Sequence, residues 1–194
     1  MLSRSIPALL CAVSLVAGAQ QAATGADSSD ITRFGATTTN MEPDGLALRF
    51  DVLAWSDEAA RSAAIAALEA EDAQDALDEL PTVGYVWPDG SPVGYAIKYA
   101  HTTATDSGER LTFVTSRPLG SYDFGGWTIA GNAPGQDLAY SVIELELDGS
   151  NAATGTASLA APVSMDAAAG MIALERSGET VALFSDVQRL EVGY

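Results

Sequence analysis

His101 is the only histidine in this chain of 194 residues and the side chain best suited to acid–base chemistry. An imidazole titrates near neutral pH and can activate a hydroxyl nucleophile as a general base. No Gly-x-Ser-x-Gly nucleophile elbow accompanies it. It follows an alternating run from Val93 to Tyr99 that is typical of a strand. We therefore interpret His101 as a strand-end residue at the rim of a sheet, with a hydrolase that uses His101 or carboxylates as the alternative.

Carboxylates are abundant, with 26 acidic residues in the chain. Glycoside hydrolysis needs two carboxyl groups placed across a bond, and Glu144 and Glu146 share one face of a predicted strand. They alternate with Ile143, Leu145 and Leu147, which must face a core. We therefore expect both glutamates to be exposed to solvent rather than catalytic.

Metal and cofactor sites are not indicated by the sequence. Cys11 is the only cysteine, whereas structural zinc is held by several Cys or His ligands. The chain contains neither an EF-hand loop with spaced acids nor a glycine-rich phosphate loop. We predict no metal and no cofactor.

Aromatic residues are better candidates for a binding site. A ring with a polar group combines apolar contact with hydrogen bonding, and ligand sites use both. The glycine-rich segment 119–137 is the longest irregular stretch of the chain, and loops of this length are often functional. The predicted contact residues around this loop are Trp87, Tyr99, His101, Arg117 and Trp127.

The elements that must position these residues are mostly short strands. Apolar and polar residues alternate over 46–52, 93–99, 141–147 and 181–187. Residues 56–80 are rich in Ala, Glu and Leu, and they predict helix that begins after an N-cap at Ser56 and breaks near 71–72. Short turns without regular βαβ alternation favour antiparallel pairing. We predict a mainly β (α+β) fold, either an antiparallel sandwich or a partly closed barrel, of about eight to ten strands with one helical insertion at about 56–80.

The first 22 residues read as a secretory signal peptide. Arg4 precedes an apolar run from Ile6 to Ala17, which is shorter than the ~20 residues that span a bilayer. We predict export to the periplasm or the medium, a disordered lead-in at 23–30 and a single antiparallel β domain at 31–194. No transmembrane segment is expected after the leader is removed.

The formal net charge is −17, and Lys98 is the only lysine. Such a chain repels phosphate backbones, which depend on Lys and Arg for affinity. Nucleic acid is therefore excluded as a partner, and the expected partner is a small molecule or a protein. The sequence leaves the oligomeric state open.

Short motifs follow one another from Val83 onward. They are Val83-Gly-Tyr85, Gly94-Tyr95, Thr115-Ser-Arg-Pro-Leu-Gly120, Ile143-Glu-Leu-Glu-Leu-Asp148 and Asp186-Val187. Over about residues 83–190 the chain thereby resembles a group of exported bacterial proteins of uncharacterised function. The resemblance implies no activity for any residue. It supports a defined bend at 117–120, where Pro118 keeps Arg117 extended, Gly120 permits a tight turn, and Arg117 pairs with a carboxylate.

These observations favour an exported, acidic binding or interaction module with an aromatic-rimmed surface around 119–137. The alternatives are the hydrolase and a structural component of the cell envelope. An enzyme should hold His101 beside a serine or carboxylate in a cleft. A binding module should show an aromatic-lined hollow, and an envelope component a broad apolar patch or an open strand edge.

Overall fold

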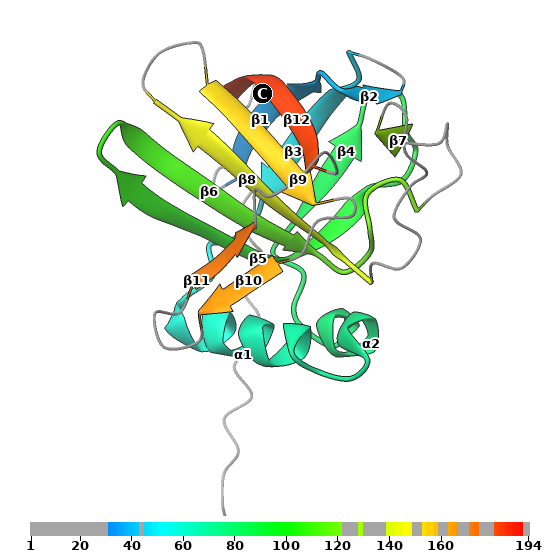
Figure 1. Cartoon of the computed structure of the whole chain (residues 1–194), viewed down its shortest axis with the longest axis vertical. Coiled ribbons are helices and arrows are strands. Elements are labelled where there is room, and N and C mark those ends of the chain that lie inside the picture. Colours follow the sequence, from blue (N-terminus) through cyan, green and yellow to red (C-terminus); the bar gives the residue numbers. More distant parts are fainter. Residues whose placement is uncertain are drawn as a thin grey trace, which may run out of the picture.

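In a computed structural model of the chain, eight antiparallel strands close into a barrel (Figure 1). The structure describes residues 31–42, 45–121, 128–129, 139–148, 153–158, 163–166, 171–174 and 181–191. The predicted leader, the lead-in and Trp127 lie outside these residues. The barrel strands are β1 (Thr32–Thr38), β3 (Ala47–Val52), β4 (Gly84–Pro88), β5 (Tyr95–Thr105), β6 (Gly108–Thr115), β8 (Ser141–Leu147), β9 (Ala153–Ser158) and β12 (Val181–Leu190).

The barrel strands follow chain order, each pairing with the next, and β12 returns to pair with β1. The predicted mainly β fold is thereby confirmed, and of the two predicted architectures the structure has the barrel, fully closed. Two small sheets lie outside it: β2 (Met41–Glu42) pairs with β7 (Thr128–Ile129), and β10 (Val163–Asp166) pairs with β11 (Met171–Leu174).

The predicted helical insertion forms two helices, α1 (Glu58–Leu68) and α2 (Ala73–Asp78), which lie together beneath the barrel (Figure 1). The N-cap of α1 is Asp57, whose carboxylate accepts a hydrogen bond from the backbone N–H of Ala60 at 2.8 Å. Ser56 was the predicted cap, but its hydroxyl instead accepts from Ala100 N–H on β5 at 3.0 Å. The predicted break is confirmed, because Asp72 caps a second helix.

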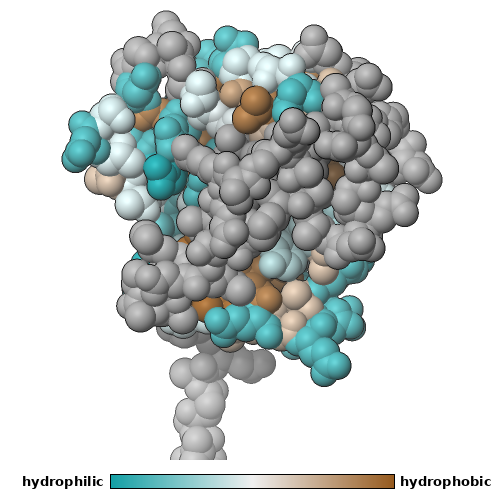
Figure 2. All heavy atoms as spheres, in the orientation of Figure 1, coloured by the Kyte–Doolittle hydropathy of each residue, from teal (hydrophilic) through white to brown (hydrophobic). Residues whose placement is uncertain are grey.

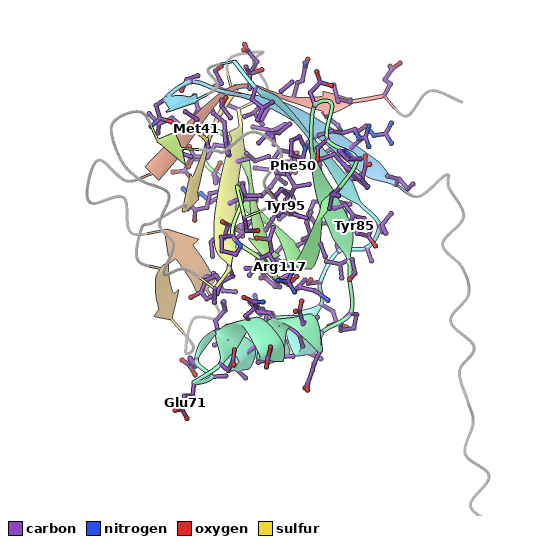
Figure 3. All side chains as sticks on the ribbon, turned by 90° about the vertical axis from the view of Figure 1, so that its right-hand side faces the viewer. Met41, Phe50, Glu71, Tyr85, Tyr95 and Arg117 are labelled. Atoms are coloured by element: carbon purple, nitrogen blue, oxygen red, sulfur yellow. The ribbon has the colours of Figure 1, made fainter. Side chains whose placement is uncertain are left out.

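Aromatic and branched side chains fill the interior of the barrel. Phe34, Phe50 and Phe113 are fully buried there, and the rings of Phe50 and Phe113 stack at 5.5 Å. Figure 3 shows Phe50 and Tyr95 inside the barrel. The ring centroid of Trp55 lies 6.4 Å from the ring centroids of both Phe34 and Phe113, so the indole covers this core where β3 ends. The barrel interior is therefore a packed core.

A second apolar cluster lies on the outside of the barrel. Tyr99, Val114 and Val142 on β5, β6 and β8 pack against helix residues that include Leu77 and against Ile172 of β11. We call this side, formed by β5, β6 and β8, the covered wall. In Figure 2 hydrophilic residues lie at the lower edge of the coloured surface, with hydrophobic residues directly above them.

A β-bulge changes the predicted facing of β5. The register to β6 shifts between Ile97 and Tyr99. Ile97 and Ala100 therefore belong to the interior core, whereas Tyr99 faces the helices. The sequence predicts one uniform alternation from Val93 to Tyr99, and this prediction is wrong at the bulge. One extra residue there moves the following side chains to the opposite face of the strand.

No helix in the described part of the chain is both long enough and apolar enough to cross a membrane.

Candidate functional site

A groove of about 370 Å³ lies on the outside of the barrel, across β12, β1, β3 and β4. We call this side the open wall. Since β1 stands four strands from β6 in either direction around the barrel, the open wall lies opposite the covered wall. The groove is lined by Gly35, Ala36, Thr37, Ala47, Leu48, Arg49, Trp87, Pro88, Asp89, Gly90, Ser91, Asp186, Gln188 and Leu190.

Small residues at the outward positions of β1 and β3 create the hollow. Gly35 and Thr37 alternate with the inward-facing Phe34 and Ala36, and Thr37 pairs with Ala47 on β3. A Cβ atom at Gly35 would come within 3.2 Å of the Leu190 side chain. The glycine therefore leaves space for Leu190 of β12 beside β1. Larger side chains stand on either side of this floor, on β3 and β4 and on β12.

Trp87 forms the aromatic side of the groove. The alternation of β4 places Val86 in the core and directs Tyr85 and Trp87 outward, with their rings 5.8 Å apart. Gly94 lies against the indole, since a Cβ there would approach its ring atoms to 2.8 Å. The Arg49 guanidinium lies 5.6 Å from the ring centroid. Trp87 is thus held between neighbours and half-buried.

Arg49 is held in place by a shared carboxylate. Asp51 accepts hydrogen bonds from Nε of Arg33 at 2.6 Å and from Nε of Arg49 at 3.1 Å. Because Nε is the atom used, the Nη group on the opposite edge of the Arg49 guanidinium points away from this contact. Within the described ranges neither Nη group makes a hydrogen bond.

A bulge in β12 shapes the far side of the groove. Gly35 pairs with Gln188 and Thr37 with Ser185, so β12 holds one extra residue over this interval. That segment contains Asp186, whose φ of 53° lies in the left-handed region that Asp adopts more readily than most residues. Both Asp186 and Gln188 line the groove as a result.

The structure separates the residues that the sequence assigns to one contact surface. Trp87 lines the groove, and Trp127 lies outside the described residues. Tyr99 is only 2% exposed, because the bulge in β5 turns its side chain toward α1. The prediction that Tyr99 is a surface contact is therefore wrong. Arg117 lies at the base of the barrel facing the helices (Figure 3) and makes an ion pair with Asp78 at 3.5 Å.

His101 stacks beside Tyr99, with 6.0 Å between the ring centroids. It is half-buried, and its imidazole makes no hydrogen bond or ion pair with the described residues. Burial raises the pKa of the Tyr99 phenol, and the nearby Arg61 partly opposes that shift. This pair belongs to the edge of the covered wall and does not adjoin the groove.

The burial of Glu144 contradicts a second prediction from the sequence. It is 3% exposed, between Thr112 on β6 and Thr156 on β9, whereas the sequence predicted exposure. The outer face of β8 belongs to the covered wall, which the alternation within a single strand cannot reveal. Glu146 is half-buried and pairs with Arg110 at 2.8 Å. The described residues contain no group of three or more His, Cys, Asp and Glu side chains that could hold a metal ion.

The groove residues that were not predicted from the sequence include Arg49, Gly35, Asp89, Asp186 and Gln188. The alternation over 46–52 had already placed Arg49 on the polar face of a strand, and that was the one available signal. No family model, curated protein or solved structure matches the chain.

Proposed function

We propose that this protein is an exported, non-enzymatic binding module whose ligand site is the groove on the open wall. The observation that carries the proposal is the arrangement of Trp87 and Arg49 beside a floor of small residues. A volume of about 370 Å³ is within the range of small-molecule sites. An indole supplies apolar contact while Arg49, Gln188 and Asp186 supply polar groups, which is the usual composition of such sites.

The fixed position of Arg49 further supports binding. Its Nε–Asp51 hydrogen bond and its contact with the Trp87 ring hold the guanidinium before any ligand arrives. A preordered side chain loses less conformational entropy on binding, so more of the contact energy becomes affinity.

The contact site proposed here is Trp87 and the open wall, whereas most of the segment 119–137 lies outside the described residues. The first residues of that segment are tied to the barrel: Leu119 N–H donates to Ser141 Oγ, and Gly120 N–H donates to Tyr95 Oη, both at 3.0 Å. The hydrolase alternative has less support, because His101 stacks on a tyrosine instead of hydrogen bonding to a described serine or carboxylate.

Fluorine NMR of protein labelled with 5-fluorotryptophan tests the proposal. The chain has three tryptophans, so each signal can be assigned with a single Trp→Phe variant. A fragment mixture of neutral polyols, carboxylates and amines is the probe. We expect at least one fragment to shift the Trp87 signal with saturation while leaving the Trp55 signal in place. If no fragment moves the Trp87 signal at millimolar concentration, the groove is not a binding site.

A further inference from the structure

The charges around the groove restrict which ligands it can accept. Asp89 lies on the β4–β5 side and Asp186 on the β12 side, and both are exposed. An anionic ligand would meet these two carboxylates within a protein of formal net charge −17. Arg49 is the one cation among the described residues that line the groove, and Asp51 already neutralises it in part. Anions are therefore disfavoured.

Cationic and purely apolar ligands meet a different obstacle. A cation that approached the Trp87 ring would have to lie beside the Arg49 guanidinium, which is already 5.6 Å from the ring centroid. An apolar ligand would remove water from Arg49, Gln188 and the two carboxylates without replacing their hydrogen bonds, and that desolvation is costly. The ligand class that meets neither obstacle is a neutral molecule that forms hydrogen bonds.

The polar side chains offer both donors and acceptors. The Arg49 Nη groups donate, the Asp89 and Asp186 carboxylates accept, and the Gln188 carboxamide does both. A hydroxyl group also donates and accepts, so adjacent hydroxyls on a ligand can satisfy planar side chains on both sides of the groove. The indole of Trp87 requires, in addition, a flat apolar face on the ligand.

We infer that the groove binds a neutral saccharide, with the C–H face of one sugar ring against Trp87 and its hydroxyls on Arg49, Gln188 and Asp186. This inference rests on the proposed function, because it names the ligand class of the same site. The groove lies on the outside of the barrel and has a volume of about 370 Å³, so a sugar ring can enter it from solvent.

Oligosaccharides that include neutral, cationic and anionic members provide the test. The probes are hexamers of N-acetylglucosamine, glucosamine and galacturonic acid, together with neutral hexamers of glucose, xylose and mannose. We expect at least one neutral hexamer to shift the Trp87 fluorine signal with saturation, and the glucosamine and galacturonic acid hexamers to bind at least about tenfold more weakly or not at all.

Two variants locate the binding. Trp87→Ala removes the aromatic platform and should weaken saccharide binding, measured by calorimetry, by about tenfold or more. Ala47→Phe leaves Trp87 and Arg49 in place but fills the floor, and should abolish binding. Ala47 is exposed on its strand, so the larger side chain has space in the folded protein. Leu183→Ser is the matched control, since Leu183 is exposed on β12 but does not line the groove.

The outcomes separate the inference from the proposed function. If charged fragments move the Trp87 signal and no neutral saccharide does, the saccharide inference is overturned and the binding function stands. If nothing moves that signal, both fail. Saccharide binding that survives both Trp87→Ala and Ala47→Phe would place the site elsewhere and overturn both.

Discussion

The covered wall and the open wall enclose the same packed interior but carry different outward side chains. On β5, β6 and β8 the outward residues include Tyr99, Val114 and Val142, and two helices with the β10–β11 hairpin lie over them. On β1, β3 and β4 the outward residues include Gly35, Arg49 and Trp87, which border a groove. Outward apolar rows require a cover, whereas small and polar rows leave a surface to which a ligand has access.

The cover on the first wall is attached by charges as well as by apolar contacts. Lys98 Nζ donates to the backbone oxygens of Asp78 and Leu80 at 3.1 and 2.9 Å, where α2 ends. A cation at a helix C-terminus also interacts favourably with the helix dipole. Arg117 reaches the Asp78 carboxylate from the barrel. Lys98, the single lysine of this acidic chain, therefore helps to attach α2 to the covered wall.

Leu77→Ala should have the largest effect on stability. Leu77 is fully buried between α2 and the barrel, so the variant loses apolar burial and leaves a cavity. We expect the free energy of unfolding, measured with urea, to fall by about 2–5 kcal/mol. A loss below about 0.5 kcal/mol, the size of an ordinary surface substitution, would show that the helices do not cover this wall.

Asp51→Ala should be the most damaging change on the open wall. Asp51 accepts from two arginines, and hydrogen bonds to charged groups contribute about 1.5–3 kcal/mol. We expect a loss of this size in urea denaturation, together with a shift of the Trp87 fluorine signal, because Arg49 loses its anchor. Asp51→Asn, which keeps an acceptor oxygen, should lose less. An unmoved Trp87 signal in Asp51→Ala would mean that the ion pair does not position Arg49.

High pH should destabilise the covered wall in particular. Tyr140 is partly buried and packs against the same apolar cluster as Tyr99. Burial raises the pKa of both phenols above the ordinary value of 10.0. The unfolded chain therefore loses these protons at a lower pH than the folded protein does. Stability is unaffected well below pH 10 and falls as pH rises past the unfolded pKa toward the folded one, by at most about 1.4 kcal/mol per pH unit for each tyrosine.

Urea denaturation between pH 9 and 11 measures this effect. Tyr99→Phe cannot ionise and should show a shallower fall than the wild-type protein. Identical slopes for the two proteins would contradict the burial of this phenol.

Ala47→Phe should have the smallest effect on stability. The position is exposed on a strand, where aromatic residues are well tolerated, so the free energy of unfolding should change by no more than about 0.5 kcal/mol. The Trp87 signal should nevertheless shift, because the new ring fills the groove beside it. A large loss of stability would show that the open wall is covered after all.

Local pattern predicted much of the fold and little of the site. Alternation over 46–52 located β3, and the Ala-rich composition of 56–80 located both helices and the break between them. The bulge at Ile97–Tyr99 was missed, since an extra residue in a strand leaves no signature in side-chain type here. Trp87 was identified from its residue type, whereas Arg49 and Gln188, which line the same groove, lie on strands distant from it in the sequence.

The sequence by itself determined the two-residue rhythm of the strands, the helical insertion and the strongly acidic charge, because each depends on neighbouring residues or on composition. Tertiary structure alone determined that β12 closes onto β1, that Tyr99 and Glu144 are buried on the covered wall, and that Gly35, Arg49 and Trp87 share a groove. The physical reason is that strand register and closure depend on pairing between distant segments, such as Arg33 with Leu190, and one shifted residue exchanges the inner and outer faces.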